Sequence, residues 1–226
     1  MKGKGLIIDL DDTLVDSEQA YRLALKSVGI SNDSERYSIA RQTVKERLGL
    51  ESPASHNRLL YFKELARQNN SWQPLDLMTQ MHTYESALTE NIRQQWEDLK
   101  RDKLMRRIST HYKLLILTNE NTRTQLLKLN AMDPQGKWFC HLLSSEELGV
   151  EKPASLAFEK AMNLLNLPAS DCIAIGNNFK SDLEPALKMG MNAILTTEFT
   201  HSPLKDIPEN AVTVLKKLDE LIQVLQ

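Results

Sequence analysis

The stretch Leu6-Ile7-Ile8-Asp9-Leu10-Asp11-Asp12-Thr13-Leu14 decides the fold. Its apolar start, residues 6–8, is typical of a strand that is buried on both faces, as strands of parallel sheets are. Asp9 and Asp11, two positions apart in an extended segment, would point to the same side about 6–7 Å apart. Two ionised carboxylates so close together cost free energy unless a cation or hydrogen-bond donors stabilise them. The stretch is therefore either an acidic turn that merely ends a strand or one part of a site.

Composition places the chain among ordinary globular proteins. Of its 226 residues, 41% are hydrophobic and 26% charged, and the formal net charge is −2. Nothing in that balance attracts nucleic acid or an anionic membrane. The N-terminal apolar run is too short for a signal peptide or a membrane span, so we expect a cytoplasmic protein. Cys140 and Cys172 have no close-spaced thiol partner, which favours reduced core cysteines, and no H-x-x-x-H pair suggests a histidine metal site.

Hydrophobic periodicity divides the chain in two. From residue 17 to about residue 92, apolar residues recur at helical spacing without any strand pattern. From residue 112 onward, short apolar runs alternate with helical patterns, which predicts a parallel sheet. The expected strands are residues 6–8, 112–117, 139–143, 172–175, 192–195 and 212–214, and helices are expected over 96–108, 124–132, 153–165, 181–189 and the tail from Leu215 to Leu225. The sequence thus predicts an α/β fold: a Rossmann-like core of residues 1–15 and 95–226 with an all-helical cap, residues 16–94, inserted after the first strand.

Polar residues stand at the predicted strand ends, where open parallel sheets bind ligands. These residues are Asp9, Asp11, Thr118, Asn119, Lys152, Asn177 and Asp182. Carboxylates could bind a hard cation, a hydroxyl and an amide could hold phosphate oxygens, and a lysine could offset negative charge. Taken singly, each has a structural alternative: Thr118 and Asn119 could be a strand end and turn, Lys152 a surface lysine, and Asp182 a helix cap in the capping-box pattern from Ser181 to Glu184.

Four motifs, in order along the whole chain, resemble those of the haloacid dehalogenase (HAD) superfamily. The D-x-D-x-T-L motif lies at residues 9–14, a strand ending in Thr-Asn at 114–119, and G-x-x-K-P at 149–153. The fourth motif, normally Gly-Asp followed by a second Asp, is only partly kept at residues 176–182, where Asn177 replaces the first Asp. A helical cap after the first motif is also a feature of that family.

The resemblance implies a role for each matching residue. Asp9 would attack phosphorus and form an aspartyl-phosphate, and Asp11 would be the general acid and base. Thr118 and Asn119 would bind the phosphoryl group together with Lys152, which would also offset charge on the nucleophile. Mg²⁺ would be bound by Asp9, Asp11, Asn177 and Asp182, weakly because an amide brings no charge. Asp12 is left as a turn residue.

The expected function is therefore Mg²⁺-dependent hydrolysis of a small phosphomonoester through an aspartyl-phosphate. The alternative is an impaired relative that binds a phosphorylated metabolite or a partner protein without efficient turnover, and a phosphomutase also stays open. Retention of Asp11 favours phosphate chemistry over carbon–halogen cleavage, because a halide leaving group needs no proton. The substrate depends on which residues of the cap face the site, with Tyr21, Arg22, Arg41, Lys45, His56 and Arg58 as candidates. Neither the substrate nor the oligomeric state follows from the sequence.

Overall fold

The computed structural model describes residues 4–49, 52–70, 73–200, 207 and 211–225. Within them a six-stranded parallel sheet has the order β3-β2-β1-β4-β5-β6. The strands are β1 (Lys4–Ile8), β2 (Tyr112–Thr118), β3 (Phe139–Ser144), β4 (Cys172–Gly176), β5 (Asn192–Thr196) and β6 (Thr213–Leu215). The α/β fold with a Rossmann-like sheet is confirmed. β2 and β3 lie on one side of β1, and β4, β5 and β6 lie on the other. β1 therefore lies at the switch point of the sheet, where successive strands begin to be added on the opposite side.

Both faces of the sheet are covered, which explains the unbroken apolar runs. Successive side chains of a strand point to opposite faces. Leu6 and Ile8 of β1 belong to the core on one face, while Ile7 belongs to the core on the other. Each of these side chains is at most 2% exposed, and burial of each contributes about 1.5–3 kcal/mol to stability.

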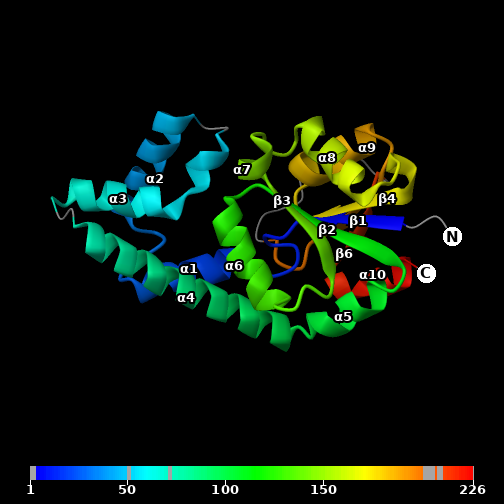
Figure 1. The fold of residues 1–226 in the computed structure, drawn as a ribbon, viewed down its shortest axis with the longest axis horizontal. Helices are drawn as coiled ribbons and strands as arrows, with labels where there is room; N and C mark the ends of the chain where they lie inside the picture. The colour runs from blue at the N-terminus through cyan, green and yellow to red at the C-terminus, as the bar shows by residue number, and fades with distance from the viewer. Residues whose placement is uncertain (1–3, 50–51, 71–72, 201–206, 208–210, 226) are drawn as a thin grey trace.

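The helices of the core pack on these two faces (Figure 1). Residues of α5 (Arg101–Ile108), α6 (Thr122–Met132) and α10 (Leu221–Val224) belong to the core beneath Leu6. Residues of α8 (Ser155–Leu165) and α9 (Glu184–Lys188) belong to the core beneath Ile7. Short turns complete this part: α7 (Ser145–Leu148), η2 (Ala169–Asp171), η3 (Phe179–Leu183) and η4 (Leu218–Glu220).

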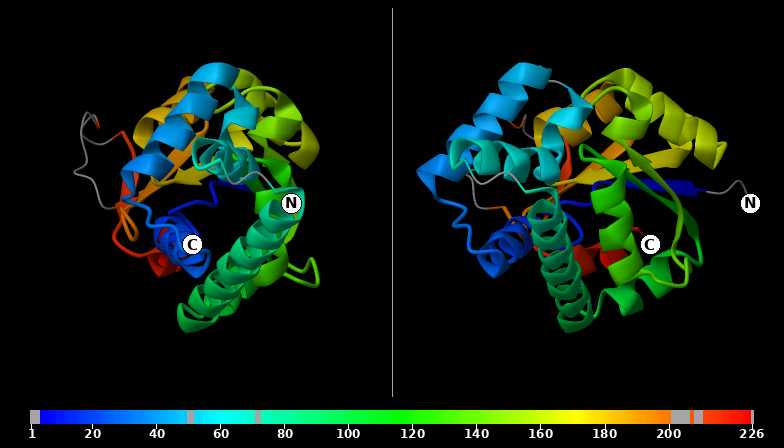
Figure 2. Two further views of the ribbon diagram at one scale, coloured as in Figure 1. Left: turned by 90° about the vertical axis from the view of Figure 1, so that its left-hand side faces the viewer. Right: turned by 60° about the vertical axis from the view of Figure 1, so that its left-hand side comes forward.

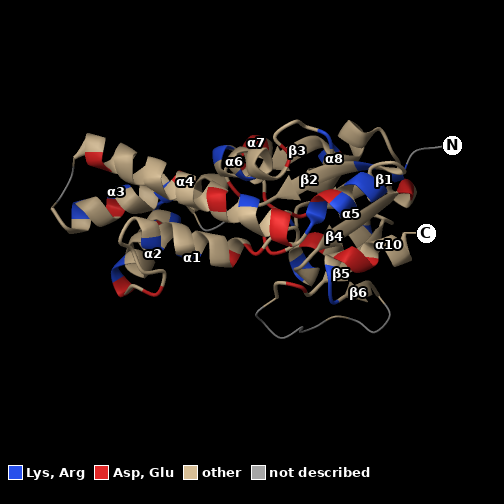
Figure 3. Cartoon of the chain, turned by 90° about the horizontal axis from the view of Figure 1, so that it is seen from below, with Lys and Arg blue, Asp and Glu red and all other residues tan. Residues whose placement is uncertain are grey.

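In the described part of the chain, the segment between β1 and β2 is helical. It contains α1 (Ser17–Ser27), α2 (Glu35–Leu48), η1 (Pro53–His56), α3 (Arg58–Gln68) and α4 (Pro74–Asp98) before α5 begins. Figure 1 shows this insert on the side toward which the strand arrows point, and both views of Figure 2 show α4 as its long outer helix. In Figure 3 basic and acidic segments are interspersed over the insert and the sheet domain. The proposed cap boundary at residue 94 lies inside α4, which runs on to Asp98 without a break.

Two side chains fasten the insert to the core where the chain leaves and returns. Gln95 of α4 accepts a hydrogen bond from the backbone N–H of Asp16 (2.7 Å) and donates one to its carbonyl (3.0 Å). Arg101 of α5, which is fully buried, donates to the carbonyl of Leu14 and pairs with Glu198 (2.7 Å). The two connections are therefore held to each other and to the loop after β5.

Several element boundaries differ from the sequence prediction. The helix expected over 96–108 is broken at Lys100, whose φ of +54° ends α4 before α5 begins. Pro153 does not open α8; it lies in a turn in which the backbone N–H of Ala154 donates to the carbonyl of Glu151, and the helix starts at Ser155. The expected tail helix is also wrong at its start, because Leu215 pairs with Thr196 as the last residue of β6.

The cysteines and the membrane expectation can be compared with the structure directly. Both cysteines are free thiols, and Cys172 is buried, but the placement of Cys140 in the core is wrong. Cys140 is exposed because β3 is an edge strand of the sheet. Within the described residues, none of the helices combines the length and apolarity required to cross a lipid bilayer.

Candidate active site at the carboxyl ends of the strands

Asp9 lies directly after β1, at the switch point of the sheet. Its backbone N–H donates to the carbonyl of Ile175 in β4 (2.8 Å), so the chain still follows β4 as it leaves the sheet. The turn that comes next contains Asp12 with a φ of +56°, as expected of a turn residue. This turn brings the Thr13 hydroxyl back to donate to Oδ2 of Asp9 (3.0 Å). The motif at residues 9–14 thus supplies both the Asp9 carboxylate and the hydroxyl that holds one of its oxygens.

Lys152 joins Asp9 to Asp182. Its Nζ lies 2.7 Å from Oδ1 of Asp9 and 2.8 Å from Oδ1 of Asp182, and the three side chains are 4–9% exposed. The surface reading of Lys152 is therefore wrong. A lysine that loses its water must be paired, and here two carboxylates from different loops pair with it.

Asn119 holds the backbone of the Lys152 loop. Its side-chain amide donates to the carbonyl of Lys152 (2.8 Å), and its oxygen accepts from the N–H of the same residue (2.7 Å). This reciprocal pair fixes the loop after α7 against the end of β2. The geometry gives Asn119 a positioning role, and its expected contact with phosphate stays a prediction.

The loop after β4 is built around Asp182. Asn178, rather than Ser181, caps the helical turn, because its side chain accepts from the N–H groups of Lys180 and Ser181. Oδ2 of Asp182 in turn accepts a hydrogen bond from the backbone N–H of Asn178 (3.0 Å). Gly176 is required here, since a Cβ at that position would lie 2.4 Å from Oδ2 of Asp182.

Asp11 has a lysine of its own. Nζ of Lys128, from α6, donates to Oδ1 of Asp11, and Nε2 of Gln125 donates both to Oδ2 of Asp11 (2.7 Å) and to the Thr118 hydroxyl oxygen (3.0 Å). The Lys128 side chain is 0% exposed, and Thr118 is buried at the end of β2. Gln125 therefore links the expected proton shuttle to the expected phosphate-binding hydroxyl.

Both lysines lower the pKa of the neighbouring carboxyl group, but the net pKa shifts of Asp9 and Asp11 are opposite. Burial raises the pKa of Asp9 to about 7; Lys152 opposes this rise, but the negative charges of Asp182 and Asp11 add to it. Burial would raise the pKa of Asp11 as well, but the charge and hydrogen bond of Lys128 outweigh it, and the pKa of Asp11 is lowered. The surroundings therefore destabilise the ionised form of Asp9, whereas they stabilise the ionised form of Asp11.

A second group of side chains connects Asp11 to the helical insert. The Tyr21 hydroxyl of α1 donates to Oε2 of Glu120 (3.1 Å), and Arg58 of α3 pairs with the same carboxylate. Two cations contact the Tyr21 ring: the guanidinium carbon of Arg58 is 4.1 Å and Nζ of Lys128 is 4.4 Å from its centroid. Such cation–π contacts strengthen when they are desolvated.

Gln125, Lys128 and Glu120 were missed from the sequence. A signal for them exists: α6 follows the polar end of β2 after three residues, so its first two turns must lie close to the strand ends. Gln125 and Lys128 stand three apart on that helix, which places them on one face. Polar residues on a face that must pack inward require partners, and Asp11 is the acidic group nearest to them.

The donors available to a metal ion at this edge are oxygens: the Asp9 carboxylate, the main-chain carbonyl of Asp11 and the amide of Asn177. Within the described residues, no group of three or more histidines, cysteines or carboxylates has metal-binding geometry. Mg²⁺ fits such a set, because it prefers oxygen ligands and few protein carboxylates, and the raised pKa of Asp9 marks negative charge that a cation would relieve. Both oxygens of Asp182 accept hydrogen bonds, as do both oxygens of Asp9, so these contacts do not distinguish Asp182 from Asn177 as the direct ligand.

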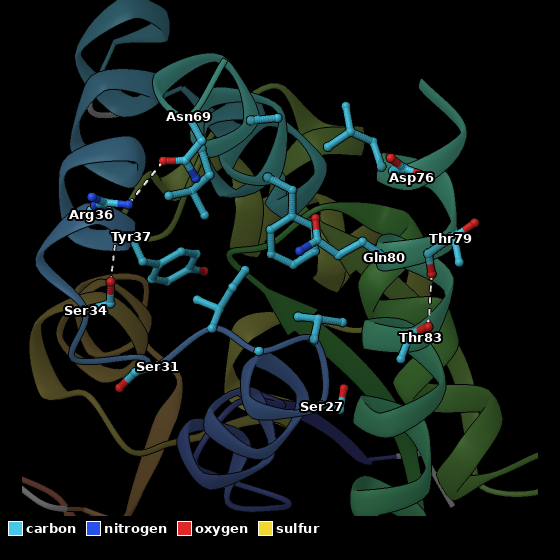
Figure 4. A pocket seen from close by; sticks show the side chains of 17 residues that line it. Ser27, Ser31, Ser34, Arg36, Tyr37, Asn69, Asp76, Thr79, Gln80 and Thr83 are labelled. Carbon is cyan, nitrogen blue, oxygen red and sulfur yellow. Dashed lines mark hydrogen bonds between the residues drawn. The ribbon is translucent and has the colours of Figure 1, made fainter. Parts of the chain in front are cut away.

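Two cavities lie within the helical insert. The one in Figure 4 has a volume of about 690 Å³ and is bounded by residues including Ser34, Arg36, Asn69 and Thr83. It contains none of the expected site residues. The other, of about 310 Å³, reaches Asp12 and Tyr21 beside the strand ends. Tyr37 lines both.

The chain is similar to known phosphatases over most of its length. The chain is 28% identical over 226 residues to the ribulose-1,5-bisphosphate 5-phosphatase of Halopiger xanaduensis, with 92% of this chain and 90% of that protein covered. It is 27% identical over 240 residues to the glyceraldehyde 3-phosphate phosphatase of Methanothermobacter thermautotrophicus, with 98% and 99% covered.

Among solved structures, the magnesium-bound putative HAD-hydrolase YfnB from Bacillus subtilis superposes with a TM-score of 0.68 at 20% identity, covering 100% of this chain and 99% of that one. At this identity the likeness concerns the fold. The sequence model of the haloacid dehalogenase-like hydrolases matches residues 4–190. The chain therefore belongs to the family of haloacid dehalogenase-like hydrolases.

Proposed function

We propose that this protein is a Mg²⁺-dependent phosphatase that cleaves a small phosphomonoester through an aspartyl-phosphate. One observation carries the proposal: the Asp9 carboxylate is held by Lys152 and Thr13 at the switch point of the sheet. The similarity to phosphatases over most of the chain supports the reaction class. Asp11 supports it as well, since a phosphate ester has an alcohol leaving group that must be protonated.

In the first step an oxygen of Asp9 attacks phosphorus, and the bond between phosphorus and the alcohol oxygen breaks. Asp11 gives its proton to the departing alcohol. Lys152, already bonded to Asp9, offsets the charge that develops on the phosphoryl oxygens, and the Thr118 hydroxyl can donate to one of them, because the hydrogen bond that Gln125 makes uses only its lone pair.

In the second step Asp11, now a carboxylate, removes a proton from water. The oxygen of that water attacks phosphorus, the bond between phosphorus and Asp9 breaks, and inorganic phosphate leaves. Lys128 favours the carboxylate form of Asp11, which suits this step. Asp9, the Asp11 carbonyl and either Asn177 or Asp182 would hold Mg²⁺, which when bound polarises the phosphoryl group and offsets the charge of Asp9.

The test is hydrolysis of p-nitrophenyl phosphate with and without Mg²⁺, in the wild type and in Asp9→Asn. We expect metal-dependent turnover that falls at least about 10⁴-fold in the variant, because the nucleophile is lost. Asp33→Asn, which changes an exposed carboxylate of the insert in the same way, is the matched control and should retain wild-type rates. Turnover independent of Mg²⁺, or an Asp9→Asn variant as fast as the wild type, would contradict the proposal.

The alternative, binding of a phosphorylated metabolite without turnover, is favoured only by the neutral Asn177. It predicts that a non-hydrolysable phosphonate binds while every ester tested stays intact. Measurable Mg²⁺-dependent hydrolysis would exclude it.

A further inference from the structure

We propose that the smaller cavity of the insert takes the alcohol part of the substrate and that this part carries a second anionic group, bound by Arg41 and Arg58. The inference rests on the proposed phosphatase function and names the substrate class. The cavity holds about 310 Å³ and is bounded by α1, α2, α3 and α4. Among the residues that line it are two arginines and four tyrosines: Arg41, Arg58, Tyr21, Tyr37, Tyr61 and Tyr84.

Three cations lie in or beside this cavity: Arg41 and Arg58 line it, and Lys45 lies near them without lining it. Arg41 and Lys45 stand one turn apart on α2, and within the described residues neither makes an ion pair or hydrogen bond. Burial lowers the pKa of Lys45, and the neighbouring charges of Arg41 and Arg58 lower it further, although Glu151 and Glu120 oppose them. Of the three cations, Arg58 has a carboxylate partner, Glu120. Like charges held together in this way are stabilised when an anion binds between them.

Of the tyrosines that line this space, Tyr21 and Tyr61 already donate to Glu120 and to the carbonyl of Ser55, whereas Tyr84, among the described residues, retains a free hydroxyl donor. Burial raises the pKa of Tyr37, Tyr61 and Tyr84, so their hydroxyls stay protonated. Tyr84 is 1% exposed, and its hydroxyl has no hydrogen-bond partner of acceptable geometry in the described part of the chain, although it lies close to Arg58. A buried, unsatisfied hydroxyl costs free energy. A polar ligand in the cavity would remove that cost.

The position of the cavity fits the alcohol side of a phosphomonoester. Asp12 and Tyr21 line the end nearest the strand ends. Asp12 adjoins Asp11, and Tyr21 contacts Lys128, the partner of Asp11. Because Asp11 protonates the leaving alcohol in the proposed reaction, the alcohol must begin at Asp11 and continue past it. Asp12 and Glu18 could accept hydrogen bonds from substrate hydroxyls, while Arg58, stacked on Tyr21, and Arg41 of α2 line the rest of the cavity with Tyr37.

The test compares esters that differ only at the end remote from the phosphate that is cleaved. For a carboxylate, 3-phosphoglycerate is compared with glycerol 3-phosphate; for a second phosphate, 1,3-propanediol bisphosphate is compared with its monophosphate. We expect the wild type to have at least tenfold higher kcat/KM for the doubly anionic member of one pair, about the effect of one charge-assisted hydrogen bond. Which pair shows the preference distinguishes a carboxylate from a phosphate.

Arg41→Gln should reduce that preference about tenfold, because it removes a cation without shortening the side chain greatly. Tyr84→Phe should raise KM for the preferred ester with less effect on kcat, since it deletes only the donor. Arg22→Gln is the matched control: Arg22 is exposed on α1, does not line the cavity, and should leave the preference unchanged.

The outcomes separate this inference from the function on which it rests. If no ester, including p-nitrophenyl phosphate, is hydrolysed, the proposed function fails. If esters are hydrolysed but neither pair shows a preference, or if Arg41→Gln slows both members of a pair equally, then the cavity does not bind a second anion and the inference is wrong.

Discussion

Asp9 and Asp11, two residues apart in the sequence, each contact a buried lysine, but the charges around the two lysines differ. Lys152 is shared between Asp9 and Asp182, so one positive charge faces two negative ones. Lys128 faces Asp11 alone, and Gln125 adds a donor. The pKa of Asp9 is raised, while the pKa of Asp11 is lowered. The difference teaches that burial and an adjacent lysine do not by themselves determine the pKa of a carboxyl group. The other charges around the lysine determine it.

Lys152 contacts the expected nucleophile, so removing it should lower activity more than removing Lys128. Lys152→Met leaves Asp9 and Asp182 facing each other without a cation, and we expect kcat/KM to fall about 10²–10³-fold. Steady-state kinetics with p-nitrophenyl phosphate measure this fall. Lys188→Met, which breaks an exposed lysine–glutamate pair on α9, is the matched control. If Lys152→Met and Lys188→Met behave alike, the shared pair has no catalytic role.

Removing Lys128 should alter the proton shuttle instead. In Lys128→Met the burial of Asp11 loses its largest opposing interaction, so the pKa of Asp11 rises. We expect the basic limb of the pH profile of kcat/KM for an alkyl phosphate to move to higher pH, because Asp11 then stays protonated, as the general acid must be, over a wider pH range. The move should be smaller for p-nitrophenyl phosphate, whose leaving group needs little protonation. An unchanged basic limb with the alkyl phosphate would mean that Lys128 does not set the protonation of Asp11.

The shared pair also predicts how the metal site responds to added charge. Asn177→Asp places a carboxylate beside Asp9, where the existing negative charge is already only partly balanced. The Mg²⁺ concentration that gives half-maximal activity should fall about tenfold, because a charged oxygen binds Mg²⁺ more tightly than an amide. Magnesium titrations of the wild type and the variant measure it. An unchanged midpoint would show that Asn177 is not a ligand.

The smallest expected effect is on stability. In EDTA the folded-state pKa of Asp9, about 7, lies above its ordinary value. Asp9 therefore stabilises the fold fully only below its unfolded pKa, and this contribution is lost as pH rises through 7. Asp9→Asn should match the wild type near pH 4 and melt a few degrees higher at pH 8. Thermal unfolding in EDTA at both pH values measures it. A variant that is less stable than the wild type at pH 8 would show that the ion pair with Lys152 outweighs burial.

Much of this arrangement could be predicted from the sequence. The apolar runs predicted all six strands within one or two residues of where the structure has them, because strands buried on both faces must be apolar throughout. Asp9, Thr118 and Lys152 were predicted from motifs at the strand ends, and the structure brings Asp9 and Lys152 into contact. Helix boundaries were less accurate at Lys100, Pro153 and Leu215, where local turns and β6 pairing override helical spacing.

By itself, then, the sequence determined which carboxylates stand at the switch point, because the spacing of a strand and its terminal residues is local. Only the tertiary structure showed that a second lysine, Lys128, faces Asp11 and that Lys152 is shared between Asp9 and Asp182. Lys128 reaches Asp11 across 117 residues and Lys152 reaches Asp9 across 143. The pKa values of Asp9 and Asp11 differ because the charges around them differ. That difference depends on distances between segments remote in sequence, and no local pattern encodes those distances.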